Sequence, residues 1–388
     1  MVETLKDSVQ KIVELQRDRL IELSLTIHDN PELGLQEQKA AAWLSSYLEE
    51  HGFAVSKGIA GLATAFRAVY GGGSPRIAFL AEYDALPEIG HGCGHNIIAA
   101  AAVGAAVACR SVVDEHGGSV VVLGTPGEEV IGGKINMLEA GAFDGLDVAM
   151  LVHPNTRNMA TEETLACVTL EVEFFGRPAH AAAQPHAGIN ALDALILAFT
   201  AINSLRQHMK SEARVHGIIT DGGEAPNIVP AHSAATFLVR ALDSRYLEKL
   251  RERVLECFVA ASIATGARLE YRWGNRSYAP MKNNMTLAEL FRKNLELLGR
   301  QVVAFSPDFG LGSTDMGNVS QVVPSIHGTV AIAPAEVLIH TPEFAAAAAS
   351  EAGHQGLLDA AKAMAMTLVD ILCQPGVLER IREEFQCG

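Results

Sequence analysis

The chain has 388 residues, of which 49% are apolar, and its formal net charge at pH 7 is −15. A chain of this length exceeds the usual size of a single hydrophobic core, so we expect two domains. The acidic balance, with no cluster of Lys and Arg, argues against nucleic acid or an anionic membrane as a partner and favours a small-molecule substrate.

The cysteine spacing and the first residues of the chain indicate the cellular compartment in which the protein is expected. Six cysteines without the spacing of a disulfide framework fit a reducing compartment, where a thiol can serve as a metal ligand. The opening residues, MVETLKDSVQ, are charged and lack an apolar signal core. The longest apolar run, residues 97–109, is expected to be too short to span a bilayer and to form a buried helix. We therefore expect a cytoplasmic protein.

The first part of the chain predicts helices followed by a sheet. Apolar residues recur at helical spacing over residues 5–27, the sequence NPELG then breaks the pattern, and a second amphipathic helix runs to about residue 50. Three short apolar runs follow, separated by helical stretches at 96–115 and 133–140. This alternation predicts an α/β domain with a mostly parallel sheet and helices on both faces; the three runs are 76–86, 119–129 and 147–154.

Polar residues close each of these runs. Ligands of open parallel sheets bind beyond the carboxyl ends of the strands. The sequence places five candidate side chains at those ends, namely Glu82, Asp84, Glu128, Glu129 and His153.

From about residue 166 the pattern changes to strand, helix, strand, strand, helix, strand, which is the order of a ferredoxin-like α+β unit. Its segments are 167–175, 189–208, 213–221, 232–241, 244–264 and 267–273. We therefore expect an inserted domain at residues 166–275 within a discontinuous domain made of residues 1–165 and 276–388. That domain resumes with a helix at 286–298, the loop GLGSTDMGNVS and a long final helix from about residue 344.

The stretch EYDALPEIGHGCGHN, residues 82–96, carries the first candidate metal ligands. Cys93 and His95 lie on a glycine-lined turn before a helix, whose N-terminus favours a thiolate. By itself this pattern is equally compatible with a buried structural cysteine and a capping histidine. Two adjacent carboxylates, Glu128 and Glu129 of TPGEE, end an otherwise apolar strand. Such a pair repels unless a cation lies between the carboxylates or one of them holds a proton for acid–base catalysis.

Two further histidines complete the set. His153 closes the next strand in LVHP, and His340 lies in IHTPEF before the final helix. Thiolate, imidazole and carboxylate ligands together suit Zn²⁺ or a similar ion. Because five ligands exceed one tetrahedral site, two metals that share ligands are plausible.

The ordered motifs EYDALPEIGHGCGHN, TPGEE, LVHP, GRPAHAA, GGEAPNIVP, GSTDMGNVS and IHTPEF resemble those of the aminoacylase/carboxypeptidase G family of two-metal amidohydrolases. The resemblance spans essentially the whole chain and is closest to the cysteine-containing branch, on the side of p-aminobenzoyl-glutamate hydrolase and the aminoacylase-like dipeptidases. It implies a homodimeric enzyme that hydrolyses the amide bond of an N-acyl amino acid or a dipeptide. It also implies two divalent metal ions per subunit, zinc or manganese.

The resemblance also implies a role for each motif residue. Glu128 would be the general base, and the inserted domain would be a lid and dimerisation domain. His180 would reach the partner's active site and steady the oxyanion, while Asn227 and Arg240 would hold the substrate carboxylate. The implied metal ligands are Cys93, His95, Glu129, His153 and His340.

Two positions depart from the family pattern. Many members have His-x-Asp where this chain has Glu82-Tyr83-Asp84, which leaves Glu82 undecided as a ligand and makes Asp84 a residue that supports a ligand. Asn96 replaces the Asp that often follows Cys-Gly-His. Two other classes of function stay open: a metal-free hydrolase with Cys93 as nucleophile, and a non-catalytic binding protein on the same scaffold.

Overall fold

The computed structural model describes residues 2–387, which fold into two compact units. Unit 1 comprises the chain up to Glu163, Met281–Gly310 and the chain from Asp315 onwards. Unit 2 comprises Thr164–Pro280 together with the short segment Leu311–Thr314. The boundaries expected from the sequence were 165/166 and 275/276, and they did not assign residues 311–314 to the inserted unit.

Unit 1 is built on a six-stranded sheet in the order β1-β2-β4-β3-β5-β10. Strand β3 pairs in parallel with β4 and β5, and β10 pairs in parallel with β5, while β1 and β2 form an antiparallel edge. The sheet is therefore largely parallel, as predicted, and the carboxyl ends of β3, β4, β5 and β10 share one edge. The strands are β1 Ala54–Lys57, β2 Phe66–Gly72, β3 Arg76–Ala81, β4 Gly118–Gly124, β5 Val148–Asn155 and β10 Ser325–Ala331.

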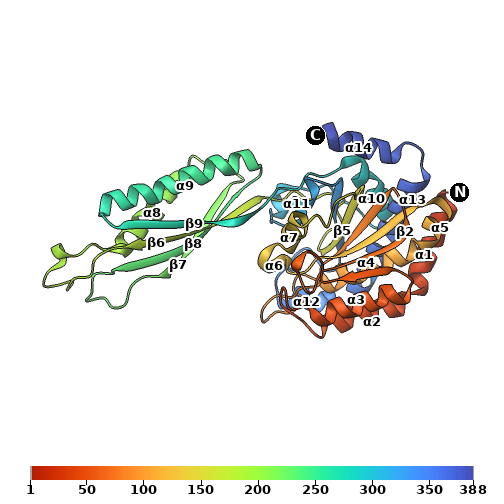
Figure 1. Ribbon diagram of the computed structural model, residues 1–388, viewed down its shortest axis with the longest axis horizontal. Coiled ribbons are helices and arrows are strands. Elements are labelled where there is room, and N and C mark those ends of the chain that lie inside the picture. The colour runs from red at the N-terminus through yellow and green to blue at the C-terminus, as the bar shows by residue number, and fades with distance from the viewer. Residues whose placement is uncertain (1, 388) are drawn as a thin grey trace. The chain divides into compact units, whose positions relative to one another are not determined.

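Helices surround this sheet (Figure 1). Those that precede or lie between the first five strands are α1 Val2–Leu15, α2 Arg17–His28, α3 Gln38–Glu50, α4 His95–Ala108, α5 Arg110–His116, α6 Glu128–Ile131 and α7 Gly133–Glu139. Those that follow the insertion are α10 Met285–Leu297, α11 Met316–Ser320, α12 Pro342–Ala348, α13 Glu351–Cys373 and α14 Val377–Cys387.

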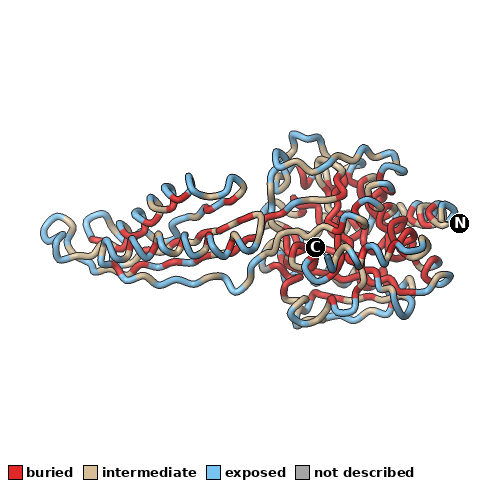
Figure 2. The backbone as a smooth tube through the Cα atoms, turned by 90° about the horizontal axis from the view of Figure 1, so that it is seen from above, coloured by how far each residue is buried: buried red, intermediate tan, exposed pale blue. Residues whose placement is uncertain are grey.

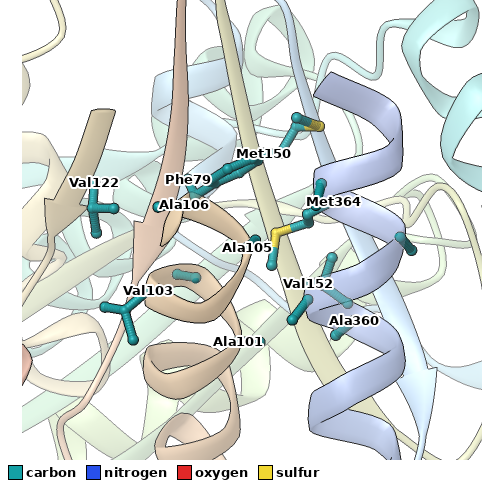
Figure 3. Packing of buried hydrophobic residues seen from close by; sticks show 14 of the residues in the cluster. Phe79, Ala101, Val103, Ala105, Ala106, Val122, Met150, Val152, Ala360 and Met364 are labelled. Atoms are coloured by element: carbon teal, nitrogen blue, oxygen red, sulfur yellow. The ribbon is translucent and has the colours of Figure 1, made fainter. Parts of the chain in front are cut away.

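The centre of the core lies where α4 and α13 pack on the sheet. Figure 3 shows Ala101 and Ala105 of α4 and Ala360 of α13 beside Met150 and Val152 of β5. All residues of α4 are buried, and its alanines let the two helices and the strands approach closely. This packing fixes the start of α4, where His95 lies.

The apolar run 97–109 lies within a longer helical stretch. Together with its flanking residues it makes the stretch His95–His116, which is long and apolar enough to cross a membrane by length and composition. The expectation that the run forms a buried helix is confirmed. Within the fold, 89% of its apolar window is buried, as in the core helix of a globular domain.

Unit 2 has a four-stranded antiparallel sheet in the order β7-β8-β6-β9, with two helices on one face (Figure 1). Buried residues recur at helical spacing on α9, and they pack on the buried positions that alternate with less buried ones along β6 and β8; Figure 2 shows buried and exposed positions mixed within this unit. The ferredoxin-like order expected from the sequence is present. Its elements are β6 Ala166–Phe175, α8 Ala191–Arg206, β7 Arg214–Asp221, β8 His232–Ala241, α9 Ser244–Thr265 and β9 Arg268–Tyr278.

Several elements differ from the predicted pattern. The helix expected over residues 5–27 is two helices, because Gln16 leaves helical geometry with φ −96° and ψ 1°. The final helix expected from about residue 344 is likewise divided into α12, α13 and α14. Strands β1, β2 and β10 were not predicted.

Candidate active site

The candidate metal ligands come together at the carboxyl edge of the unit 1 sheet. Cys93 and His95 lie after β3 at the start of α4, Glu129 follows β4, and His153 ends β5. The Cys93 Sγ atom lies 3.3 Å from His153 Nε2. Within three groups of side chains, every potential ligand atom lies within 4.8 Å of the others, and these groups are Cys93–His95–His153, Cys93–Glu129–His340 and His95–Glu128–Glu129.

Glycines allow the turn around Cys93 to form. Gly94 has φ +76°, and a Cβ atom there would lie 2.5 Å from Pro154 Cγ. Only a glycine therefore fits between the start of α4 and the end of β5. The backbone N–H of His340 donates to Gly92 O at 2.9 Å, which joins the segment before α12 to the same turn.

Asp84 supports two of the candidate ligands. Its Oδ1 atom lies 3.0 Å from His95 Nδ1, and its Oδ2 accepts from the Glu129 backbone N–H at 3.0 Å. The Asp84 carbonyl oxygen also lies 2.9 Å from His95 Nδ1. With both of these acceptors at Nδ1, the proton of a neutral His95 ring sits on that nitrogen and Nε2 is left to bind a metal.

The donor set fits a cation. His95 Nε2 and Glu129 Oε1 are buried side-chain atoms without a hydrogen-bond partner among the described residues 2–387. They lie 3.9 Å apart, and His340 Nε2 lies 3.4 Å from the same Glu129 oxygen. Buried polar atoms rarely remain unpaired. A bound divalent ion would pair these, so the residues fit the metal chemistry that their types suggest.

The proton affinities of the site reflect burial and charge. Burial raises the pKa of the Cys93 thiol, so the helix N-terminus does not by itself give the thiolate that the sequence suggested; a thiolate needs a cation beside it. Burial also lowers the pKa of His153 to about 4 and keeps the ring neutral. For Glu128, burial and then the charges of Asp315 and Glu82 raise the pKa well above its usual value.

A buried ion cluster that the sequence did not reveal borders the site. Lys134 Nζ lies 2.5 Å from Glu82 Oε1 and 2.6 Å from Asp315 Oδ1, and all three side chains are at most 2% exposed. Burial alone would raise the pKa of Glu82, but Lys134 and His95 lower it to about 2. The second oxygen of Glu82 lies 3.5 Å from His95 Nε2, so this carboxylate faces the ligands while its other oxygen is held by Lys134.

His327 was also missed. Its Nδ1 atom lies 2.9 Å from Glu162 Oε2, and its ring centroid lies 5.6 Å from that of His153. It belongs to β10, a strand that the sequence pattern did not show. Lys134 left a clearer signal, since it is a lone charge in the apolar stretch IGGKINML.

The remaining candidates lie in unit 2, at two different places. His180 and Asn227 are neighbours: His180 forms a β-bridge with Ile228, and the Ala181 N–H donates to Asn227 O at 3.0 Å. Both residues are exposed. They lie beyond the end of the sheet at which Phe175 pairs with His232.

Arg240 lies at the other end of that sheet. It pairs with Cys167, eight residues along β8 from His232, which is about 26 Å at the usual rise per residue. A dipeptide spans about 7 Å when extended. One chain therefore cannot apply Asn227 and Arg240 to the same substrate, and the expectation that both hold one carboxylate can be met only across two subunits.

The side chains themselves are suited to donate hydrogen bonds. His180 Nδ1 accepts from the N–H groups of Ala182 and Ala183 at 3.3 and 3.2 Å, which leaves Nε2–H as a free donor in the neutral ring. Arg240 donates to Ser313 Oγ at 3.3 Å, and its buried Nε has no hydrogen-bond partner among the residues described.

Comparison with known proteins places this geometry in a family. The model of "Peptidase family M20/M25/M40" matches residues 78–363. The chain belongs to this peptidase family. It is thus a metal-dependent peptidase or amidohydrolase, as the motif series predicted.

Individual relatives match over nearly the whole length. The Xaa-Arg dipeptidase of Mus musculus is 40% identical, with 100% of this chain and 93% of that protein covered. One of the p-aminobenzoyl-glutamate hydrolase chains of Escherichia coli (strain K12) is 31% identical, with 97% and 94% covered. A dinuclear metal-binding M20 peptidase of Bacillus subtilis shares the fold, with a TM-score of 0.73 at 20% identity, over 92% of this chain and 99% of that one.

Proposed function

We propose that this M20 peptidase uses two divalent metal ions to hydrolyse the amide bond of a dipeptide or N-acyl amino acid that carries a free carboxylate. The observation that carries the proposal is the convergence of five donors from four segments, with His95 Nε2 and Glu129 Oε1 buried and unbonded among the described residues. The metal ligands proposed are Cys93, His95, Glu129, His153 and His340.

Within unit 1, Glu128 would act as the general base. Bound divalent ions would acidify a water molecule and polarise the scissile carbonyl. Glu128 would take the proton from the attacking water and deliver it to the leaving amine. Without bound cations, burial and the nearby carboxylates raise the pKa of Glu128, so the positive charge of the bound ions would be needed to keep this carboxylate deprotonated and able to act as a base. Asp84 would keep His95 and Glu129 in position.

Unit 2 would act on two active sites of a homodimer. We propose that His180 and Asn227 enter the partner's site, where His180 Nε2–H would stabilise the oxyanion, while Arg240 binds the substrate carboxylate in its own chain. The separation along β8 supports this division, because it keeps the two groups from one substrate within a chain. A dimer related by two-fold symmetry would bring them together.

The relatives suggest the first substrates to test. One is named for cleaving Xaa-Arg dipeptides and another for p-aminobenzoyl-glutamate. We propose dipeptides with a basic C-terminal residue as the preferred class, since the more similar relative carries that name. Zinc or manganese would fit the mixed sulfur, nitrogen and oxygen ligands. The cytoplasmic location stays a prediction from the sequence.

Metal content and turnover test this proposal together. Purified protein should contain up to two divalent ions per chain, and a strong chelator should abolish amine release from a panel of dipeptides and N-acyl amino acids. Cys93→Ser should lower metal occupancy sharply, because a neutral hydroxyl replaces a thiolate. Activity without metal would overturn the proposal.

The alternative with a metal-free Cys93 nucleophile has one observation in its favour, the 3.3 Å contact between Cys93 Sγ and His153 Nε2. Burial and the nearby charges of Glu129 and Glu128 raise the pKa of the thiol, which works against a nucleophilic thiolate. Chelator-resistant activity that a thiol reagent destroys would support this alternative. A non-catalytic binding protein would bind substrates without releasing amine.

A further inference from the structure

The segment that carries Glu128 is a loop with little regular structure of its own. We call residues 125–134 the base loop. It contains α6, a helix of four residues, and Gly127 at φ +68°. A Cβ atom on Gly133 would lie 1.8 Å from Pro126 O, so the loop folds back tightly on itself. A loop of this kind needs bonds from elsewhere to hold a catalytic side chain still.

Thr125, the first residue of the loop, is bonded to Ala81 O at the end of β3, and the rest of the loop is held by three buried carboxylates in three distant segments. Each accepts a hydrogen bond from a backbone N–H of the base loop, and each of the three residues is at most 1% exposed. The pairs are Glu37 with Gly127 at 2.8 Å, Asp84 with Glu129 at 3.0 Å and Asp315 with Lys134 at 2.9 Å.

Glu37 differs from the other two acids. Asp84 also contacts His95, and Asp315 also pairs with Lys134 Nζ. The second oxygen of Glu37 instead accepts from the Thr64 hydroxyl at 2.9 Å, away from the metal ligands. The Thr64 carbonyl in turn accepts from the hydroxyl of buried Tyr83 at 2.6 Å. Glu37 thus reaches the catalytic loop through a backbone N–H, from a hydrogen-bonded network of its own.

A carboxylate at this depth is costly. Glu37 is 0% exposed, and burial raises its pKa. An apolar residue would fill such a position at lower cost, so the carboxylate is explained by what it bonds. It belongs to the stretch NPELGLQEQ, whose residues have no other part in the proposed reaction.

We propose that Glu37 is a positioning residue for catalysis: by accepting the Gly127 N–H, it fixes the turn at which the base loop presents Glu128 to the reacting atoms. The proposal rests on the role of Glu128 as general base. It adds a residue outside the metal ligands, from the segment before α3, to those that govern the chemical step.

The test compares three single variants of the full-length, metal-loaded enzyme. Glu37→Ala should lower kcat about 100-fold with KM within threefold, since a misplacement of about 1 Å is sufficient for such a loss. Glu37→Gln should stay within tenfold of wild type, because its amide oxygen can still accept the Gly127 N–H. The matched control is Glu32→Ala. Glu32 lies five residues earlier, and its carboxylate caps α3 through Lys39 N and Ala40 N, so its loss should leave kcat within threefold.

A double variant separates positioning from a general structural effect. If Glu37 acts through Glu128, then Glu37→Ala should lower the residual kcat of Glu128→Gln by less than threefold. A further 100-fold loss in the double variant would overturn the proposal. So would a Glu37→Ala enzyme whose kcat is unchanged, or a Glu37→Gln enzyme as impaired as Glu37→Ala. An active Glu128→Gln enzyme would instead refute Glu128 as the base.

Folding is checked by circular dichroism and metal content. If Glu37→Ala does not fold, the near-isosteric Thr64→Val replaces it, because it removes the donor to Glu37 without touching the base loop. That variant should lose between threefold and 30-fold in kcat, and Glu37→Gln should again stay within tenfold of wild type. A Thr64→Val enzyme with kcat within twofold of wild type would then overturn the proposal.

Discussion

At the sheet edge of unit 1, several of the proposed metal-binding and catalytic residues are held in place by hydrogen bonds to other buried side chains. In unit 2, by contrast, His180 and Asn227 lie exposed on adjoining loops. His95 and Glu129 are both fixed by Asp84, and the base loop is held by buried carboxylates. In unit 2, Arg240 is instead separated from His180 and Asn227 by the length of strand β8. Unit 1 thus presents side chains in fixed positions, and the exposed side chains of unit 2 are compatible with the proposal that they serve more than one active site.

Among the variants of unit 1 and unit 2, Glu128→Gln should cause the largest loss of activity. We expect kcat to fall by about 10²- to 10⁴-fold, the usual contribution of a general acid–base group, because an amide cannot accept the proton. Metal content and the unfolding midpoint should stay close to wild type. Steady-state kinetics together with metal analysis checks this, and activity within tenfold of wild type would identify another group as the base.

Lys134→Met should show how much the buried ion cluster of unit 1 contributes to the stability of the fold. Removing Lys134 leaves Glu82 and Asp315 buried without their cation, and breaking a buried pair in this way costs about 3–5 kcal/mol of unfolding free energy. Denaturant unfolding measures it. Arg272→Met, which removes the exposed contact with Glu171 in unit 2, is the matched control and should change stability little. Equal effects would contradict the contrast between the two regions.

His180→Ala tests the proposed role of unit 2 in the reaction. Loss of one oxyanion donor typically lowers kcat by about 10²- to 10³-fold, so we expect a loss of that size with metal content unchanged. The neighbouring His186, also exposed on the same loop, offers a control, and His186→Ala should keep kcat within threefold. If both variants behave alike, His180 has no special part in the reaction.

Arg240→Ala should have the smallest effect and should act on binding. A hydrogen bond to a charged group is worth about 1.5–3 kcal/mol, so KM for substrates with a free carboxylate should rise about 10- to 100-fold. The matching carboxamides should be turned over as before. A wild-type enzyme that does not distinguish acids from carboxamides would count against a carboxylate site at Arg240.

Those features of the fold and site that depend on local sequence patterns were mostly predicted from the sequence. The parallel sheet and the ferredoxin-like insertion follow from apolar runs and helical spacing. The set Cys93, His95, Glu129 and His153 follows from residue types at strand ends and in the glycine-lined turn before a helix. The buried residues Glu37, Lys134 and Asp315 could not be predicted to contact the site, because their contacts join segments that are far apart in the sequence. Strand β10, and with it His327, was missed for a similar reason: its residues SIHGTVA lack the strong apolar pattern of the inner strands.

The division of unit 2 between two active sites is tested most directly by mixing inactive variants. After subunit exchange, shown by a tag pull-down, an equal mixture of His180→Ala and Glu128→Gln chains should recover about one quarter of wild-type activity. Half of the dimers are then mixed, and one of their two sites is intact. Asn227→Ala with Glu128→Gln should also recover activity. Arg240→Ala with Glu128→Gln, assayed at substrate concentrations well below KM, should not, because those two residues serve the same site from one chain. Exchange without recovery in the first mixture, or recovery in the last, would contradict the account.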